Sequence, residues 1–162
     1  MLRKVTLLAA VVAVMSVVAA GAAWAAVING DNGPDVLVGT DDDDQMRGFG
    51  GADEISGLQG EDFIWAGSGN DSVWGGQDND TIRGGPGNDT LRGQGGDDEI
   101  FGGTGDDFLY GGPGDDTLDA EDDEEGNDFV SCGDGDDTVF VDEGDFVSEG
   151  CETVYVDGVL QV

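Results

Sequence analysis

Aspartate recurs at every ninth residue along most of this chain, and such a row of carboxylates is suited to holding a divalent cation. Counted in nines from Gly30, ten repeats run without a break to Asp119, residues 120–122 form an insertion, and two more repeats fit at 123–131 and 132–140. Bare carboxylates in a row repel one another, whereas Ca²⁺ binds about six to eight oxygens of carboxylates and backbone carbonyls. The candidate metal ligands are the sixth residues of all twelve repeats: Asp35, Asp44, Asp53, Asp62, Asp71, Asp80, Asp89, Asp98, Asp107, Asp116, Asp128 and Asp137.

The other columns of the repeat predict the fold. Glycine predominates in the first and fourth places and fills half of the second places, where it allows a positive φ and a tight turn. The eighth place is always aliphatic or Met, as in a short strand with one inward side chain. A turn of six and a strand of three make a half-coil, and two half-coils make an 18-residue coil. We expect an all-β fold, a right-handed parallel β-roll in which stacked coils form a two-sheet solenoid.

The eighth-place side chains are expected to form the core of this solenoid as two rows. One half-coil buries too little apolar surface to be stable alone, so its stability must come from neighbouring coils. One row is Leu37, Ile55, Val73, Leu91 and Leu109, and the other is Met46, Ile64, Ile82, Ile100 and Leu118.

Calcium is expected between successive aspartates on each edge of the stack, because residues 18 apart lie in neighbouring coils, about 5 Å apart. Magnesium demands a tighter octahedron, and zinc favours His and Cys ligands, which the unbroken block lacks. The alternative is that the aspartates only close turns, which would leave their charge uncompensated. About eight sites follow, between Asp35/Asp53, Asp53/Asp71, Asp71/Asp89, Asp89/Asp107, Asp44/Asp62, Asp62/Asp80, Asp80/Asp98 and Asp98/Asp116.

Three stretches show the repeat in its fullest form: GGPGNDTLR (84–92), GGTGDDFLY (102–110) and GGPGDDTLD (111–119). In the pattern Gly-Gly-x-Gly-x-Asp-x-apolar-x the chain resembles the RTX (repeats-in-toxin) family of calcium-binding proteins, over Gly30–Phe140. The resemblance implies a parallel β-roll that folds when calcium binds. It also implies that the sixth-place aspartates supply the side-chain ligands and that turn carbonyls complete the shell.

The first 25 residues are expected to be a secretory signal peptide. Arg3 and Lys4 precede an apolar run, and Ala23 and Ala25 form the small-x-small pattern of a cleavage site. Cleavage after Ala25 predicts a secreted, extracellular protein with no membrane span. The alternative is that the segment stays as an anchor. Many RTX proteins lack an N-terminal signal, so this feature sets the chain apart from them. The expected domains are the signal (1–25), the β-roll (26–140) and a C-terminal cap (141–162).

The composition of residues 26–162 excludes several functions. Three basic residues stand against 37 acidic ones, a formal net charge of −34, and neither lysine nor histidine is present. Nucleic acid is excluded as a partner, because its phosphates would be repelled. No tuned acid, base or nucleophile is evident, so no enzyme activity is expected. The metal-free chain should be near the disordered class until a cation offsets its self-repulsion.

The last residues leave the repeat, with Phe146 in place of the next aspartate and two stretches, TVYV and VLQV, that predict strands. We interpret 141–162 as a β cap that seals the open end of the solenoid. Cys132 and Cys151 of an exported chain are expected to form a disulfide that joins this cap to the last coil. A ligand-binding role for the tail is the alternative.

The ninth place carries all three arginines of the exported part, each one coil away from an aromatic residue. A guanidinium can lie over an aromatic ring at that spacing, and we interpret the pattern as a ladder that stiffens the roll. The alternative is a contact surface for glycans or a partner. The order is Arg47, Trp65, Arg83 and Phe101 on one face, and Trp74, Arg92 and Tyr110 on the other.

Two classes of function remain. The first is a secreted calcium-binding structural or interaction module that acts in adhesion, a matrix or a surface layer, with cell-surface or matrix components as partners. The second is a carbohydrate-binding or other ligand-binding protein that uses the Arg–aromatic ladders.

Overall fold

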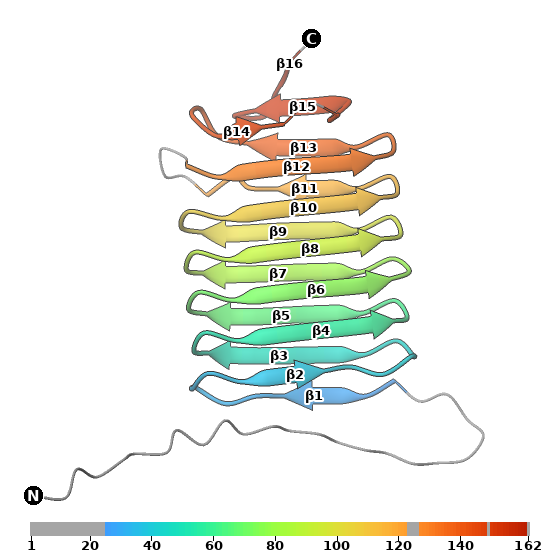
Figure 1. Ribbon diagram of the computed structural model, residues 1–162. Helices are drawn as coiled ribbons and strands as arrows, with labels where there is room; N and C mark the ends of the chain where they lie inside the picture. Colours follow the sequence, from blue (N-terminus) through green and yellow to red (C-terminus); the bar gives the residue numbers. More distant parts are fainter. Residues whose placement is uncertain (1–24, 123–126, 149, 162) are drawn as a thin grey trace, which may run out of the picture.

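The chain folds as a parallel β-solenoid, a stack of flat coils in which strands of two sheets alternate (Figure 1). The computed structural model describes residues 25–122, 127–148 and 150–161. The expected signal peptide therefore lies outside the described residues, except for Ala25.

Strands with odd numbers form one sheet and strands with even numbers form the other, apart from the final β16. Within the described residues the first sheet has nine strands. Their order is β1 (Val27–Asn29), β3 (Gln45–Gly50), β5 (Phe63–Ser68), β7 (Thr81–Pro86), β9 (Glu99–Thr104), β11 (Thr117–Asp119), β13 (Thr138–Val141), β15 (Thr153–Val156) and β16 (Val159–Gln161). The second sheet has seven described strands, in the order β2 (Val36–Val38), β4 (Glu54–Gln59), β6 (Ser72–Gln77), β8 (Thr90–Gly95), β10 (Phe108–Pro113), β12 (Phe129–Asp134) and β14 (Phe146–Val147).

Most of the core consists of the eighth-place side chains, as predicted. The strand register advances by 18 residues per coil, so that Leu37 pairs with Ile55 and Met46 with Ile64. All ten side chains of the two predicted rows have no exposed surface, and they belong to one apolar cluster. Burial of one aliphatic side chain contributes about 1.5–3 kcal/mol, so the whole row stabilises the stack although each coil supplies little.

The central strands are longer than the sequence predicted. β3 to β10 and β12 each span six residues instead of three. In β5 the eighth-place Ile64 and the first-place Ala66 of the next repeat both point inward and are buried. Elsewhere the first place is mostly glycine, which has no side chain to separate neighbouring backbones. Strand pairing therefore continues past it, as in the pair Leu58 and Gly76.

The insertion shifts the register without interrupting the core. Beyond it the strands pair with an offset of 21 residues, since Leu109 pairs with Val130 and Leu118 with Val139. Both valines are fully buried. Ala120 is also buried, and its N–H donates to the carbonyl of Phe140, so it keeps the first place of its repeat. The extra residues therefore follow Ala120.

The end of the chain continues the coils for two further strands. Phe146 pairs with Phe129, a seventh-place residue, so the prediction that Phe146 takes the aspartate's place is wrong. Asp145, one residue earlier, occupies that place. β15 then turns through Asp157 and Gly158, both at positive φ (49° and 69°), into the antiparallel strand β16. The Cys132–Cys151 disulfide is confirmed and ties this segment to β12.

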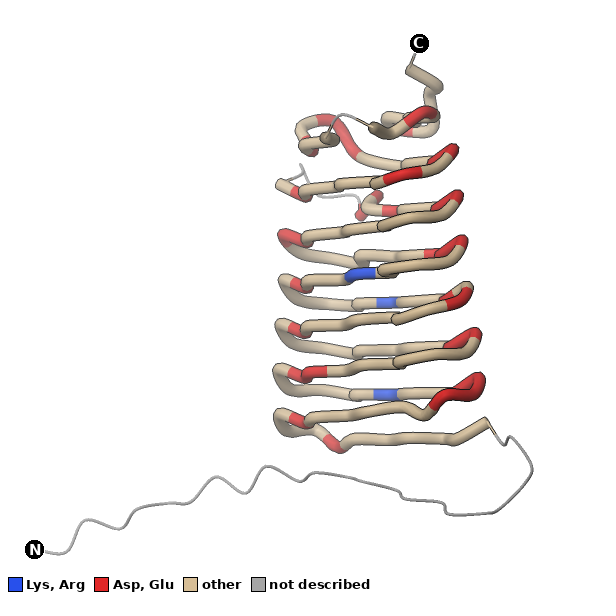
Figure 2. The backbone as a smooth tube through the Cα atoms, turned by 45° about the vertical axis from the view of Figure 1, so that its right-hand side comes forward, with Lys and Arg blue, Asp and Glu red and all other residues tan. Residues whose placement is uncertain are grey.

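Charge is distributed unevenly over the solenoid. Acidic residues gather at the turns along both edges of the stack, and the three arginines lie on the strands between them (Figure 2). In the described ranges, no helix is long and apolar enough to cross a membrane.

Candidate metal centre

The twelve sixth-place aspartates are all buried, with at most 4% of their surface exposed. Hydrogen bonds between coils arrange them in two ladders. One ladder is Asp35, Asp53, Asp71, Asp89, Asp107 and Asp128, and the other is Asp44, Asp62, Asp80, Asp98, Asp116 and Asp137. The structure thus places residues 18 apart in the sequence next to each other, as the sequence predicted.

One oxygen of each carboxylate joins neighbouring coils. The backbone N–H of ten of these aspartates donates to Oδ1 of the sixth-place aspartate one coil further on, at 2.6–2.9 Å. Asp71 donates to Asp89 and Asp80 to Asp98 in this way, both at 2.8 Å. In each aspartate that accepts such a bond, one carboxylate oxygen therefore holds neighbouring coils together.

The other oxygen, Oδ2, has no hydrogen-bond partner in nine of these aspartates, counted over the described residues. A buried polar atom without a partner costs about 1–3 kcal/mol, and more when it carries charge. The nine are Asp53, Asp62, Asp71, Asp80, Asp89, Asp98, Asp107, Asp116 and Asp137. These buried oxygens without a donor mark the places where a cation would be stabilised.

A main-chain carbonyl converges on the same space as each of several unpartnered oxygens. A Cβ added at Gly84 would collide with Asp89 Oδ2 and with the carbonyl oxygen of Gly102 in the next coil. Gly57, in an earlier coil, has the same relation to Asp62 Oδ2 and the carbonyl of Gly75. A side chain at Gly84 or Gly57 would enter this cradle, which accounts for the glycine that precedes most of the ladder aspartates by five residues; Ala66 and Cys132 stand in that place before Asp71 and Asp137. The cradle offers acceptor oxygens and no donor.

Burial and mutual repulsion raise the pKa of ten of the ladder aspartates, from Asp53 to Asp137. Burial, together with the nearby carboxylates of Asp98 and Asp62, raises the pKa of Asp80 to about 8, although the backbone N–H of Asp62 acts in the opposite direction. Burial likewise raises the pKa of Asp89 to about 7. A divalent cation would reverse this effect by favouring the charged form.

Calcium fits this set of ligands. It is a hard cation that accepts carboxylate and carbonyl oxygens at about 2.3–2.6 Å in flexible geometry. Among the described residues no three acidic, His or Cys side chains converge on one point. Each site would therefore combine the carboxylate oxygen of one coil with backbone carbonyls rather than rely on a carboxylate cluster. Calcium bound there would supply charge neutralisation and a link between coils.

The first two turns differ from the rest. Asp35 Oδ2 accepts from the N–H of Asp31 and Asp44 Oδ2 from the N–H of Thr40, both at 2.6 Å. Asp31 and Thr40 stand in the second place of their repeats and do not have a positive φ. In the repeat of every unpartnered aspartate, by contrast, the second-place residue, four positions before the aspartate, has a positive φ. This left-handed residue is glycine in six repeats, and in the other three it is Phe49 (φ 74°), Leu58 (92°) or Gln94 (84°). An unpartnered Oδ2 thus occurs in repeats whose second-place residue has a positive φ.

The ladders extend beyond the predicted aspartates. Asp145 Oδ1 accepts from the N–H of Asp128 at 3.2 Å, and Glu152 Oε2 accepts from the N–H of Asp137 at 3.0 Å. The sequence analysis missed both residues, because the spacing has shortened to 17 and 15 residues there. The apolar residues two positions further on, Val147 and Val154, pack against the core and were the available signal.

The predicted Arg–aromatic ladders have the expected stacking. The Arg47 guanidinium lies 4.6 Å from the Trp65 ring centroid, and Arg83 lies at the same distance from Phe101. On the second face Arg92 lies between Tyr110 (4.9 Å) and Trp74 (5.9 Å). All three arginines are therefore engaged on the sheet faces, away from the aspartate ladders.

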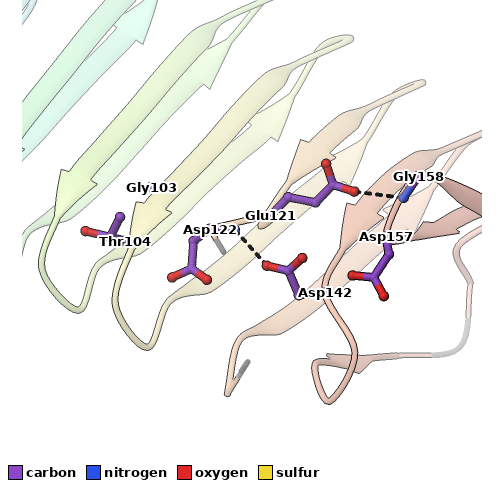
Figure 3. Close-up of a pocket in the computed structure, with 7 residues that line it drawn as sticks. All are labelled: Gly103, Thr104, Glu121, Asp122, Asp142, Asp157 and Gly158. Atoms are coloured by element: carbon purple, nitrogen blue, oxygen red, sulfur yellow. Dashed lines mark hydrogen bonds between the residues drawn. The ribbon is translucent and has the colours of Figure 1, made fainter. Parts of the chain in front are cut away.

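An acidic pocket of about 730 Å³ lies where the insertion meets the final hairpin (Figure 3). There the Asp122 N–H donates to Asp142 Oδ2 at 2.8 Å, and the Gly158 N–H donates to Glu121 Oε1 at 3.2 Å. Its described lining residues are Gly103, Thr104, Glu121, Asp122, Asp142, Asp157 and Gly158. Among them is no nucleophile paired with a base. The two hydrogen bonds join the end of the chain to the insertion.

Comparison with known protein families agrees with this geometry. The model of the RTX calcium-binding nonapeptide repeat matches residues 29–64, 47–82, 56–91, 92–124 and 122–145. These matches cover most of the chain, which therefore belongs to the RTX calcium-binding repeat family. No curated protein matches the sequence significantly. Fold and family together define a calcium-binding structural module.

Proposed function

We propose that this protein is an exported structural module whose β-solenoid forms when calcium binds along the two aspartate ladders. The observation that carries the proposal is the set of nine buried carboxylate oxygens without a partner. Each oxygen is itself buried, and in Asp62 and Asp89 it lies close to the same space as a carbonyl of the next coil. About eight ions, held by sixth-place aspartates, would satisfy most of these oxygens.

Calcium acts in this proposal through charge. Residues 26–162 carry a formal net charge of −34, from three basic and 37 acidic residues, and this charge opposes compaction. Eight divalent ions would offset about half of it. Because ions bind only the folded coils, their binding free energy becomes folding free energy. The millimolar calcium outside cells is sufficient for sites of this kind.

The proposed role is a non-enzymatic one, in adhesion, in a matrix or in a surface layer. An N-terminal signal peptide cleaved after Ala25 would deliver the chain to the extracellular space, where the Cys132–Cys151 disulfide is stable. The rigid stack would then hold its two faces and its cap at fixed positions for contact with cell-surface or matrix components.

The experiment compares two neighbouring aspartates of one turn by calorimetric calcium titration of 26–162. Asp107 is buried in the ladder with an unpartnered Oδ2, whereas Asp106 is exposed. Asp107→Asn should lower the calcium stoichiometry by about one or two ions and raise the calcium concentration needed for folding. Asp106→Asn removes the same charge and should leave the stoichiometry unchanged. Equal effects of both substitutions would show that bulk charge, not the ladder, binds the ions.

A second function has one specific observation in its favour. A shallow groove of about 600 Å³ lies over the first sheet between Arg47, Trp65 and Arg83. A carbohydrate could stack on Trp65, which is 38% exposed, and bond to the guanidinium groups. Trp65→Ala should then abolish binding in a glycan screen, while Trp74→Ala, on the other sheet, should not. Absence of any glycan ligand would exclude this function.

A further inference from the structure

The second aspartate ladder begins with a residue that is not an aspartate. From Asp62 onward, each Oδ1 of this ladder accepts the N–H of the aspartate one coil earlier. For Asp44, the residue one coil earlier is Ala26, and its backbone nitrogen lies 2.7 Å from Asp44 Oδ1. Ala26 thus takes the place of the first member of the ladder.

Asp44 is a buried carboxylate whose described hydrogen bonds come from neutral donors. It is 2% exposed, and its Oδ2 accepts from the N–H and the hydroxyl of Thr40, at 2.6 and 3.1 Å. Residues 26–162 contain no lysine or histidine, and the three arginines lie over aromatic rings on the sheet faces. No side-chain cation of the described chain is therefore placed to neutralise Asp44.

The peptide bond predicted to be cleaved is the one that carries this nitrogen. Hydrolysis of the Ala25–Ala26 bond adds water, leaving a carboxylate on Ala25 and an amine on Ala26 that is protonated at neutral pH. Ala25 is exposed and Ala26 is half-buried against the core. Cleavage would therefore replace one neutral N–H donor by an ammonium group with three donors, at a point already fixed by β1.

We propose that cleavage after Ala25 creates an ion pair between the new α-ammonium of Ala26 and the buried carboxylate of Asp44, which stabilises the first coil. This inference rests on the proposed export of the chain. Both oxygens of Asp44 are occupied without a metal, so the ammonium supplies at the start of the ladder the positive charge that calcium supplies further along. The precursor forms only the weaker neutral bond.

The first test identifies the N-terminus of the exported protein. The full chain is produced with its own leader, and the secreted product is subjected to N-terminal sequencing. The expected first residue is Ala26. Any other first residue would overturn the proposal, because the ammonium would then lie away from Asp44.

The second test compares three N-termini by thermal unfolding in saturating calcium: free Ala26, Nα-acetyl-Ala26 and a free chain that begins at Ala25. Acetylation is selective, because residues 26–162 contain no lysine. It keeps an N–H at Ala26 and removes the charge, while the Ala25 chain keeps the charge and displaces it by one residue. Free Ala26 should have the highest Tm, by about 4 °C. Equal Tm values for all three would overturn the proposal.

A thermodynamic cycle assigns the effect to Asp44. In Asp44→Asn, acetylation should no longer lower the Tm, whereas in Asp35→Asn, the matching carboxylate of the other ladder, it should lower the Tm as in the wild type. An undiminished effect in Asp44→Asn would exclude this partner. Calcium-induced folding is recorded for each form, so that failure of the metal sites is seen separately from failure of the ion pair.

Discussion

Each ladder aspartate uses its two oxygens for different purposes. Oδ1 accepts a backbone N–H from the preceding coil, as in the bonds from Asp71 to Asp89 and from Asp80 to Asp98. Oδ2 has no donor in reach in nine of the described aspartates. Asparagine could keep the first bond but would bring an NH₂ group or a neutral oxygen to the second position. The repeat therefore requires the charge of aspartate as well as its shape.

Glycine in the fourth place is required by conformation. Gly87 has φ 142°, and a Cβ there would collide with the carbonyl of Gly69 in the coil below. Gly87→Ala should therefore destabilise the calcium-bound fold by about 1–3 kcal/mol, measured by chemical unfolding in saturating calcium.

The matched control is Gly95→Ala, in the third place of its repeat. A Cβ there has no neighbour within 4 Å, and the residue has no positive φ. This variant should be as stable as the wild type. If Gly87→Ala were equally stable, the left-handed turn would not be a requirement of the fold.

The sequence predicted the ladder residues well, because a fixed period reports their register directly. It could not separate Asp35 and Asp44 from the other ladder members. The second-place residues Phe49 and Leu58 depart from glycine just as Asp31 does, yet they adopt a positive φ and Asp31 does not. The deciding factor is backbone conformation, which the stacking of later coils imposes on unfavourable residues at a cost of about 1–3 kcal/mol each.

At the scale of elements, the half-coil is the unit of the fold, and its core position was predictable from one column. The length of its strand was not. The glycine-rich places of a single repeat predict a turn. In the stack they pair with the same places of the neighbouring coils, as Gly76 does with Gln94 and Gly85 with Gly103. Pairing between coils is a property of neighbours, so that one repeat taken alone underestimates the strand.

The C-terminal elements show how the stack ends. The irregular spacing after Val141 hid the last ladder members, Asp145 and Glu152, although both accept the expected N–H. β16 then runs antiparallel along β15 and covers its open edge, as a strand that reverses through Asp157 and Gly158 can do. These features support the proposal of a C-terminal cap.

The disulfide is expected to stabilise this end specifically. Cys132 and Cys151 are 19 residues apart, and closing a loop of this length contributes about 3 kcal/mol. The double substitution Cys132→Ser and Cys151→Ser should lower the Tm in saturating calcium and leave the calcium stoichiometry unchanged. Reduced and alkylated wild type is the control and should behave alike. An unchanged Tm in both would show that the segment is held by strand pairing alone.

At the scale of the whole molecule, two ladders of like charge run along the edges of a thin apolar core (Figure 2). Without a cation, the core and the hydrogen bonds between coils must oppose the repulsion between the carboxylates. The arginines do not help at the edges, since they lie on the faces. This arrangement makes the fold dependent on cations, and protons and calcium would compete for the same oxygens.

Acid should therefore favour the metal-free fold. Burial raises the pKa of Asp80 to about 8 and those of Asp62 and Asp116 to about 7, from 3.8. Between about pH 4 and 8 the folded chain holds more protons than the unfolded chain, so its stability falls as pH rises through this range. In chelator, the β signal in circular dichroism should increase as the pH is lowered from 8 to 5.

The control for this experiment is added sodium chloride at pH 8, which screens charge without protonating it. Salt should restore less β structure than acid does. A β signal that stays constant, or decreases, on acidification would contradict the raised pKa values and with them the burial of the ladders in the metal-free fold.

The most direct measurement is a calcium titration of purified 26–162 followed by far-UV circular dichroism, with magnesium as the control. We predict a disordered spectrum in chelator that changes to a β spectrum between about 10⁻⁴ and 10⁻³ M calcium. Magnesium at the same concentrations should have little effect, because it demands a tighter, octahedral shell. A β spectrum at pH 7 that neither calcium nor chelator alters would contradict the account, since the aspartate ladders would then be stable without a cation.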